Sequence, residues 1–452
     1  MRSVSQPTRS LPTALMYRGE RTVSDRQKNP SQSRPRVIVA GGGFAGLAAV
    51  KQLARQPVDV LWIDQKNYHV FQPLLYQVAT GLLDPETIAI PLRFCTRKWP
   101  NVRVVLGEIT DIDLTGRTVT AAADSFAYDY LLLAIGSTTN FFGNGELASR
   151  AWDMKGLTMS LRLRAEILES LERAAMETPR GQIPALAFAI VGGGPTGVEL
   201  AAALSHLVRH EIPKDYPELD TKRIPISLLQ AGDALLPSLP PAIQAYAQAR
   251  LEAQGVNVRL KSRVQHFDGR TVTLDNGECL AAPLLIWTAG VHAAPLIAKL
   301  RVSQGPGNRI EVNRNLQIPV HPEVYVLGDL TFHKDALWPQ NAPFARQSGT
   351  FAARAVLNAA LGTGPHPNFR YRDLGTMVAL GPMNAVVYLP WMGRLSARGF
   401  SGWVIWLVFH IGALVGFRNR FAALLDWGSG LMNRRPAAGL IVSYDKEPAS
   451  KK

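Results

Sequence analysis

Val37-Ile38-Val39-Ala40-Gly41-Gly42-Gly43-Phe44-Ala45-Gly46 reads as an apolar strand, a glycine-rich turn and the start of a helix. The chain repeats this pattern about 150 residues later, as Ala189-Ile190-Val191-Gly192-Gly193-Gly194-Pro195-Thr196-Gly197. In such a motif the first glycine makes the tight turn, the second lets the backbone approach a pyrophosphate, and the third lets the helix pack on the strand. The phosphates bind at the helix N-terminus. Two copies predict two bound dinucleotides, with electrons passing between them.

The residue that ends the next strand differs between the two copies. Residues 58–63 read as a strand that leads into Asp64, about 20 residues beyond the first glycines. An acid at that place binds a ribose hydroxyl. The corresponding strand of the second copy, residues 226–229, leads into Gln230. The second copy therefore lacks the acid.

Composition limits the function classes. The chain has 452 residues, 47% of them hydrophobic, which leaves room for two or three domains with cores of their own. Its two cysteines, Cys95 and Cys279, lie far apart and outside any CxxC, so we expect neither a dithiol redox centre nor a cysteine-based metal site. The nine histidines form no HExxH, and we expect no catalytic metal.

The net charge of +14 suits either nucleic acid or an anionic membrane surface. The sequence has no zinc-finger pattern, no RNP motif and no basic region leading into heptads, so we expect no nucleic-acid partner. Residues 1–35 hold seven basic residues against two acids and are predicted to be a disordered basic tail. The tail is similar to a targeting presequence, but an extension without function would look the same.

From Pro35 onward, strand-like and helix-like stretches alternate, which predicts an α/β fold with parallel sheets. We expect two Rossmann-like dinucleotide-binding domains, the second (151–280) inserted into the first (36–150 and 281–345). A C-terminal domain follows at 346–452. Two buried strands, residues 284–287 and 324–327, are predicted to return the chain to the first domain, and the second of them ends at Gly328-Asp329, where ligands bind in such folds.

The C-terminal domain contains an apolar stretch of 16 residues, 402–417, interrupted only by His410. A membrane-spanning helix needs about 20 residues, so the stretch is short for that role. Arginines flank it, and Trp403 and Trp406 are expected at the level of the lipid headgroups. We favour amphipathic helices that lie in the membrane interface, with a pair of buried core helices as the alternative.

Residues 67–81, Asn-Tyr-His-Val-Phe-Gln-Pro-Leu-Leu-Tyr-Gln-Val-Ala-Thr-Gly, fit neither helical nor strand periodicity and are predicted to form a loop that contacts a cofactor. With both fingerprints, this segment resembles the type II NADH:quinone oxidoreductases, or alternative NADH dehydrogenases, of the two-dinucleotide flavoprotein superfamily. The resemblance covers residues 36–445. It implies FAD in the first domain, a nicotinamide dinucleotide in the second, and a flavin contact from Pro73 and Leu74.

The resemblance also implies roles for single residues. The family's Ala-Thr-Gly turn appears as Ala134-Ile135-Gly136, and its flavin-contacting pair as Gly328-Asp329. Its quinone signature, Ala-Gln-x-Ala-x-Gln, appears as residues 342–347 with Pro343 in place of the first glutamine. Glu199 and Gln347 are the candidate catalytic residues. The predicted cofactor-binding residues are Gly41, Gly43, Gly46, Asp64, Pro73, Leu74, Gly136, Gly192, Gly194, Gly197, Gln230, Gly290, Gly328, Asp329 and Ala345.

The implied function is a dehydrogenase that passes hydride from NADH to FAD and two electrons on to a membrane quinone without pumping protons. Gln230 repels a 2′-phosphate less than an acid would, so NADPH stays an alternative, with Lys222 and Arg223 nearby in sequence. We expect peripheral attachment at the cytoplasmic face of a bacterial inner membrane, or at a mitochondrial inner membrane. Whether the protein forms a homodimer stays an open question.

Two other functions stay open at this point. A sulfide:quinone oxidoreductase or a disulfide reductase would need redox cysteines, which Cys95 and Cys279 do not readily supply. A flavin-bearing regulatory or scaffold protein would bind NADH with little turnover.

Overall fold

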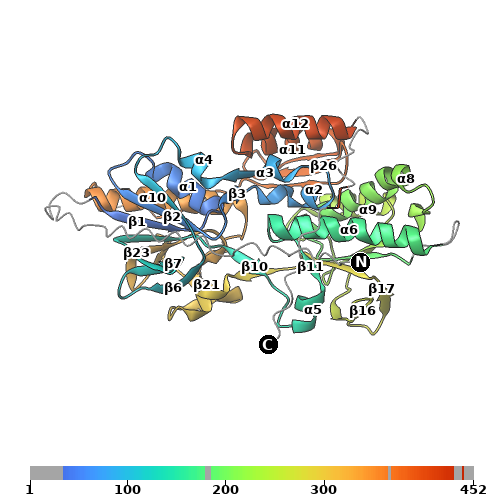
Figure 1. Cartoon of the computed structure of the whole chain (residues 1–452), viewed down its shortest axis with the longest axis horizontal. Helices are drawn as coiled ribbons and strands as arrows, with labels where there is room; N and C mark the ends of the chain where they lie inside the picture. The colour runs from blue at the N-terminus through green and yellow to red at the C-terminus, as the bar shows by residue number, and fades with distance from the viewer. Residues whose placement is uncertain (1–33, 179–184, 365–367, 432–439, 442–452) are drawn as a thin grey trace, which may run out of the picture. The chain divides into compact units, whose positions relative to one another are not determined.

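Two sheets, each built around one glycine fingerprint, form the framework of the protein (Figure 1). The computed structural model describes residues 34–178, 185–364, 368–431 and 440–441. The predicted basic tail and its targeting role therefore lie outside the described residues, apart from Arg34 and Pro35. The first sheet has the order β22 (Gln317–Ile318), β23 (His321–Val326), β9 (Tyr130–Leu133), β1 (Arg36–Ala40), β2 (Asp59–Asp64) and β5 (Val102–Leu106).

The second sheet has the order β11 (Trp152–Asp153), β18 (Leu284–Trp287), β12 (Phe188–Val191), β13 (Ile226–Leu229) and β14 (Val256–Arg259), and all its strands are parallel. The prediction that β18 returns the chain to the first domain is wrong, because β18 pairs with β12. Its four residues are buried and apolar, as in any central parallel strand. Such a pattern fits either sheet, so it does not identify the partner.

Each fingerprint strand leads into a helix, α1 (Phe44–Leu53) in the first copy and α7 (Pro195–His206) in the second. Helix α1 packs against α10 (Ala342–Leu361), and a Cβ added at Gly349 of α10 would overlap the carbonyl oxygen of Ala45. The boundary predicted at 345/346 falls inside α10. Since α10 packs on α1, we place it with the first domain.

The duplication extends beyond the fingerprints. In the first copy a three-stranded antiparallel sheet follows β5, formed by β6 (Ile109–Asp113), β7 (Thr118–Ala121) and β8 (Asp124–Ala127). In the second copy an equivalent sheet follows β14, formed by β15 (Val264–Phe267), β16 (Thr271–Leu274) and β17 (Cys279–Ala281). Each copy then closes its parallel sheet with a buried strand, β9 or β18, beside the fingerprint strand.

A two-stranded ribbon connects the two domains. The chain leaves the first domain through β10 (Ser137–Thr139) and returns through β19 (Val291–Ala293), and these two strands pair antiparallel. The backbone N–H of Asn140 donates to the carbonyl of Gly290 at 3.2 Å and so extends the pairing by one bond. The inserted domain is therefore attached by two hydrogen-bonded crossings.

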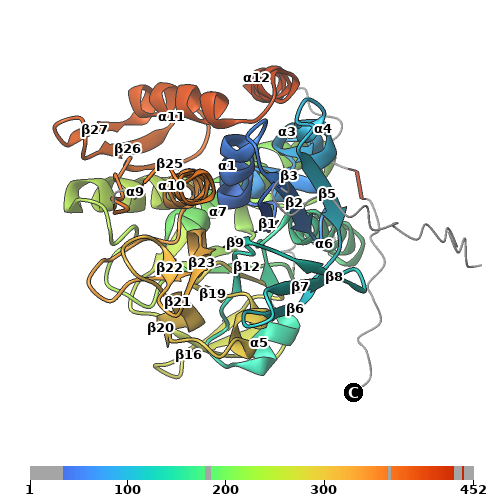
Figure 2. The same ribbon diagram turned by 90° about the vertical axis from the view of Figure 1, so that its left-hand side faces the viewer.

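The C-terminal part contains an antiparallel meander and two helices. The meander consists of β25 (Thr376–Ala379), β26 (Ala385–Leu389) and β27 (Leu395–Arg398). Helix α11 (Gly399–Ala413) packs on β26, and α12 (Phe417–Leu431) packs on α3 (Pro85–Ile88), as Figure 2 shows from the side. Asn419 Nδ2 donates to the carbonyls of Glu86 and Ala89, each at 3.1 Å, which fixes α12 to the first domain.

Both C-terminal helices expose large apolar side chains, among them Phe400 (62% exposed) and Phe417 (84% exposed). The others are Val404, Val408, Phe409, Phe421, Leu424 and Leu425. Within the described part of the chain, no helix combines the length and the apolarity that crossing a bilayer requires.

The remaining helices and strands range from two-residue strands to α6, a helix of 21 residues. They are β3 (Tyr68–Val70), α2 (Leu75–Ala79), β4 (Ala89–Pro91), α4 (Leu92–Thr96), α5 (Gly145–Arg150), α6 (Leu157–Glu177), α8 (Ile212–Asp215), α9 (Pro241–Ala253), β20 (Gln304–Gly305), β21 (Arg309–Glu311) and β24 (Thr331–Phe332). A π-helical segment, Leu207–Glu211, joins α7 to α8.

Candidate functional site

The first fingerprint forms a turn that only glycine can occupy at two of its positions. Gly41 has a φ of +115°, and a Cβ there would overlap the carbonyl group of Ala134. A Cβ at Gly46 would overlap the carbonyl oxygen of Gly41, so α1 approaches β1 as closely as backbones allow. By contrast, nothing lies within 4 Å of a Cβ built at Gly43, the N-cap of α1. The turn is tight inside and open at the helix N-terminus, which fits a pyrophosphate.

The second fingerprint repeats this geometry. Gly192 has a φ of +113°, and a Cβ there would lie 2.9 Å from Thr288 Oγ1. A Cβ at Gly197 would overlap the carbonyl oxygen of Gly192, while the N-cap Gly194 is open within 4 Å. Pro195 begins α7 at a position where proline costs no hydrogen bond. Both turns therefore fit a dinucleotide pyrophosphate.

Asp64 and Gln230 occupy equivalent positions. The carboxylate of Asp64 accepts a hydrogen bond from the backbone N–H of Gly42, and Gln230 Oε1 accepts one from the N–H of Gly193 at 2.9 Å. Burial raises the pKa of Asp64, while hydrogen bonds from the N–H groups of Lys66 and Gly42 lower it. The sequence prediction that these two residues correspond agrees with this geometry.

Three segments that are far apart in sequence meet beside the first fingerprint. Ser137, which follows Gly136, donates its hydroxyl to the carboxylate of Asp329. A Cβ built at Gly328 would lie 3.3 Å from the Cβ of Ala345. Lys155 Nζ lies 3.4 Å from Asp329 Oδ2. This ion pair could not be predicted from sequence, because Lys155 belongs to no motif. The structure thus brings Gly136, Asp329 and Ala345 together around Gly41, as expected for one cofactor site.

Gly290 lies elsewhere, beyond the end of β18, where it accepts the ribbon hydrogen bond from Asn140. Its φ is +75°, and a Cβ there would lie 2.8 Å from the Phe142 ring. Gly290 is thus the counterpart of Gly136, because each follows the closing strand of its sheet and has the same φ.

Residues 67–81 are ordered secondary structure, which corrects the prediction of a loop. They form β3, a 3-10 turn at Gln72–Leu74 and α2, and every residue of α2 is buried. Each of these elements is too short to show the helical or the strand period of apolar residues, so the sequence pattern did not predict them. Leu74 is fully buried, and Pro73 lies inside the 3-10 turn. A flavin contact from these two residues stays a prediction.

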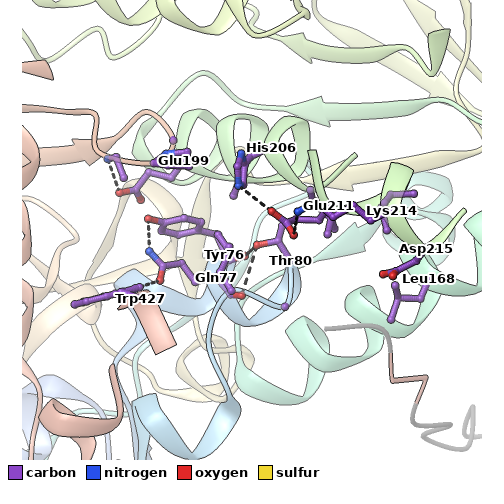
Figure 3. Close-up of a pocket in the computed structure, with 18 of the residues that line it drawn as sticks. Tyr76, Gln77, Thr80, Leu168, Glu199, His206, Glu211, Lys214, Asp215 and Trp427 are labelled. Atoms are coloured by element: carbon purple, nitrogen blue, oxygen red, sulfur yellow. Dashed lines mark hydrogen bonds and ion pairs between the residues drawn. The ribbon is translucent and has the colours of Figure 1, made fainter. Parts of the chain in front are cut away.

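A cavity of about 1040 Å³ lies between the second domain and the C-terminal helices (Figure 3). Helix α7 lines it with Glu199, Ala203 and His206, which are spaced along one face of the helix. The facing walls come from α2, α6, α8, α11 and α12. They include Tyr76, Gln77, Thr80, Leu168, Glu211, Lys214, Asp215, Trp403, Trp406 and Trp427.

Glu199 is the buried carboxyl of this cavity, 7% exposed. Its Oε1 accepts a hydrogen bond from the backbone N–H of Ala379 in β25 at 3.1 Å. Burial raises the pKa of Glu199 to about 8, against the lowering effects of this bond and of the nearby Trp406 indole. The Trp406 N–H forms no well-aligned hydrogen bond with any described residue. At neutral pH Glu199 therefore holds a proton.

An amide links the cavity wall to α12. Trp427 Nε1 donates to Gln77 Oε1 at 2.7 Å, and Gln77 Nε2 donates to the hydroxyl of Tyr76 at 2.9 Å (Figure 3). Burial, and then the neighbouring Glu199, raise the pKa of Tyr76, so its hydroxyl keeps its proton. Trp406, expected at the headgroup level, is 2% exposed and stacks on His410 with ring centroids 4.2 Å apart. That expectation is wrong, because the Trp406 side chain lies in the protein core and not on the exposed face of α11.

Gln347, the second candidate catalytic residue, is not among the residues that line this cavity. Its side chain holds the backbone of Arg372, donating to the carbonyl at 2.9 Å and accepting from the N–H at 3.0 Å. Pro343 stands at the N-terminus of α10, where Asn341 caps the helix by accepting from the N–H of Phe344 at 2.9 Å. A quinone contact from Gln347 stays a prediction.

The two cysteines lie in different parts of the fold, Cys95 in α4 and Cys279 in β17, and both are free thiols. Burial raises the pKa of the Cys95 thiol, which disfavours its reactive thiolate. Neither residue lines the cavity that contains Glu199.

Sequence and structure comparisons relate this chain to known proteins. Residues 35–349 match the family model described as pyridine nucleotide-disulphide oxidoreductase. The chain is 36% identical over 440 residues to the type II NADH:quinone oxidoreductase NdhA of Mycobacterium tuberculosis, covering 93% of this chain and 92% of that protein. It is 34% identical to Ndh of the same organism, over 90% and 91% of the two chains.

Among solved structures, NDH2 from Plasmodium falciparum in complex with NADH superposes with a TM-score of 0.81 at 21% identity. The superposition covers 89% of this chain and 99% of that one, and it establishes a shared fold. The family model and the mycobacterial relatives go further, because they match most of the sequence itself. The chain belongs to the type II NADH:quinone oxidoreductases, within the pyridine nucleotide-disulphide oxidoreductase family.

Proposed function

We propose that the protein oxidises NADH and reduces a membrane quinone without moving protons across the membrane. In the balanced reaction, NADH, one proton and the quinone give NAD⁺ and the quinol. When bound by the first domain, FAD supplies the relay that takes two electrons from one substrate and delivers them to the other. The observation that carries this proposal is the cavity that joins α7 of the second domain to the aromatic helices α11 and α12.

The first domain would hold FAD through the open N-cap at Gly43, the ribose acceptor Asp64, and the cluster of Gly136 and Asp329. The second domain would hold the nicotinamide dinucleotide through the N-cap at Gly194 and the neighbouring Gln230. In each site the chain binds and orients its ligand through backbone N–H groups and one strand-end side chain.

The cavity suits the quinone better than it suits a dinucleotide. Its α7 wall runs from Glu199 to His206, so it extends away from the helix N-terminus where a pyrophosphate binds. Its other walls include Trp403, Trp406 and Trp427 from the two helices with exposed apolar side chains. A ring dissolved in lipid would meet these helices first. The cavity thus gives a lipid-soluble substrate a route toward the domain interface.

Glu199 is the proposed proton donor of this cavity. Quinone reduction needs two protons, and a carboxyl group with a pKa near the working pH donates well. The Glu199 carboxyl holds one proton at neutral pH because burial disfavours its charge. The hydrogen bond from the Ala379 N–H fixes Oε1 and leaves the other oxygen to carry that proton.

We propose peripheral attachment through the exposed apolar side chains of α11 and α12. Arg394 and Arg398 precede α11, and Arg418 lies on α12, so cationic side chains border the apolar face. The cytoplasmic face of a bacterial inner membrane is the proposed location, and the mitochondrial inner membrane is the alternative. In vesicle flotation, Phe400→Ser with Phe421→Ser should release the protein from anionic vesicles, whereas Met176→Ser, an exposed apolar residue of α6, should not.

Turnover decides between this enzyme and a flavin-bearing scaffold. The purified protein should be yellow and should oxidise NADH with a short-chain quinone at many turnovers per second. A scaffold would bind NADH with negligible quinone reduction. A colourless protein, or one whose NADH oxidation does not depend on added quinone, would contradict the proposal. Sulfide should not replace NADH, because the thiols of Cys95 and Cys279 lie in separate elements outside the cavity.

A further inference from the structure

A basic loop adjoins Gln230 at the carboxyl edge of the second sheet. This basic loop, residues 260–263, follows β14. Its backbone is hydrogen-bonded to the residues that follow β13. The N–H of Ser262 donates to the carbonyl of Gln230 at 2.9 Å, and the N–H of Lys261 donates to that of Gly232 at 2.8 Å. The loop therefore has a fixed position beside the residue that replaces the ribose-binding acid.

The charges of this loop are available to a ligand. Lys261 and Arg263 are exposed, and neither forms an ion pair with any residue that the structure describes. The neighbouring Arg259, in contrast, is neutralised by Glu278. Two acids lie nearby: Asp233 follows Gln230, and Asp275 donates its backbone N–H to the carbonyl of Arg263 at 2.9 Å. Among the described residues, neither carboxylate forms an ion pair with Lys261 or Arg263.

Lys222 and Arg223, which the sequence suggested for this role, lie at the wrong end of the sheet. They belong to a 3-10 turn that precedes β13 and thus lie at the amino edge of that strand. The pyrophosphate turn, Gln230 and the basic loop all lie at the carboxyl edge. Proximity in sequence was misleading because the four residues of β13 carry the chain across the sheet, about 13 Å at the usual rise per residue.

The position of Gln230 indicates what such a loop would bind. An acid at this place would accept the 2′-hydroxyl of the adenosine ribose and repel a phosphate on it. The Gln230 amide is uncharged, and the N–H of Gly193 holds its Oε1. A 2′-phosphate beside Gln230 would meet the ammonium and guanidinium groups of the adjoining loop, which form strong charge-assisted hydrogen bonds with phosphate.

We infer that Lys261 and Arg263 form a subsite for the 2′-phosphate of NADPH, and that the protein oxidises NADPH as well as NADH. The inference rests on the proposed function, since it assigns the nicotinamide nucleotide to the second domain. The balance is that of the NADH reaction: NADPH, one proton and the quinone give NADP⁺ and the quinol. The 2′-phosphate contributes binding and takes no part in the electron transfer.

The test compares kcat/KM for NADPH and for NADH in Lys261→Gln/Arg263→Gln and in the wild type. We expect the NADPH value to fall roughly ten- to a hundred-fold, since one or two charge-assisted bonds are lost, and the NADH value to change far less. Lys222→Gln/Arg223→Gln is the matched control, because it removes the same charge from the other edge of the same sheet. The control should leave the ratio of kcat/KM for NADPH to kcat/KM for NADH within about two-fold of the wild type. High salt should reduce this ratio only in proteins that keep the two charges of the loop.

A binding measurement separates this inference from the proposed function. By calorimetry, 2′,5′-ADP should bind the wild-type holoprotein more tightly than 5′-AMP, from which it differs only by the 2′-phosphate. The loop variant should bind the two equally. This result needs no quinone and no turnover. Equal binding of 2′,5′-ADP and 5′-AMP by the wild type would overturn the subsite. An equal fall of the NADPH to NADH ratio in the loop variant and in the control would overturn it too. Absence of NADH oxidation with preferential 2′,5′-ADP binding would overturn the proposed function and leave the subsite standing.

Discussion

The two nucleotide-binding domains are copies of one design with different polar groups at two places. Both have a glycine with a φ near +115° after the first strand, a third glycine against the carbonyl of that residue, and an open N-cap between them. They differ at the end of the second strand, where Asp64 of the first copy corresponds to Gln230 of the second. They differ again two residues beyond the third glycine, where Ala48 of α1 corresponds to Glu199 of α7.

This difference shows which parts of the motif bind any dinucleotide and which parts choose one. Backbone geometry is common to both copies, so it recognises the pyrophosphate that FAD and NAD(P)H share. At the two positions that differ, the first copy contributes the charge of Asp64 and the second copy contributes the proposed proton donor Glu199. Asp64 would anchor a resident ribose, Gln230 would bind an exchangeable nucleotide, and Glu199 would donate a proton to the quinone.

The largest expected effect comes from Gly46→Ala, with Gly197→Ala as the matched change in the other copy. Each added methyl would overlap a backbone carbonyl and would force helix and strand apart, a cost on the order of 1–3 kcal/mol or more. Gly46→Ala should yield protein without flavin absorbance. Gly197→Ala should keep the flavin and lose NADH oxidation. If Gly197→Ala lost the flavin and Gly46→Ala kept it, our assignment of the two copies would be reversed.

Next in size is Glu199→Gln, which removes the proton donor that the first copy lacks. Glutamine mimics the protonated carboxyl and can accept the Ala379 hydrogen bond, so the fold should remain. We expect kcat with quinone to fall about 100-fold. In the wild type kcat should decline above a pH of about 8, as the Glu199 carboxyl loses its proton, and the variant should lack this decline. Identical pH profiles would show that Glu199 donates no proton.

A smaller effect is expected for Gln230→Glu, which makes the second copy resemble the first. The new carboxylate would repel a 2′-phosphate and accept a ribose hydroxyl, so the kcat/KM ratio of NADPH to NADH should fall about ten-fold. Gln265→Glu, which adds the same charge on an exposed position of β15, should leave the ratio unchanged. An unchanged ratio in Gln230→Glu would mean that the strand-end residue does not select the nucleotide.

The last prediction concerns stability and not activity. Because the pKa of Glu199 is raised to about 8 in the folded protein, the native state binds a proton that the unfolded chain releases above its ordinary pKa of 4.5. Wild-type stability should therefore fall, relative to Glu199→Gln, as pH rises from about 5 to 8. The slope should be at most about 1.4 kcal/mol per pH unit. Thermal unfolding midpoints of both proteins at pH 5 and pH 8 measure this, and parallel shifts would contradict the raised pKa.

Sequence predicted the parts of the site that depend on local geometry. Glycines at fixed spacing allow one kind of turn, so both fingerprints and the match of Asp64 with Gln230 could be read directly. The place of Asp329 followed from the rule that ligands bind at the carboxyl ends of parallel strands, whereas the role of Gly136 came from the family resemblance. Sheet membership of Leu284–Trp287 could not be predicted, because a buried apolar strand fits any central position.

The other parts of the site depend on packing between residues that are far apart in sequence, which the sequence pattern does not reveal. Trp406 belongs to an apolar stretch whose uniform hydrophobicity does not reveal which face packs on the protein, and the structure buries it beside Glu199 and His410. Tyr76 and Gln77 reach the cavity because α2 packs on α6 and α7 of the second domain, and Trp427 binds Gln77 from 350 residues away. Lys261 adjoins Gln230 through strand pairing, which sequence distance hides.

The paired crossings of β10 and β19 also have a mechanical consequence. A domain on a single tether can swivel, whereas two strands held by hydrogen bonds resist twisting and shear and permit bending about one axis. The ribbon therefore helps to fix the orientation in which the second domain presents its nucleotide to the first. Each new nucleotide then meets the first domain in the same orientation, turnover after turnover.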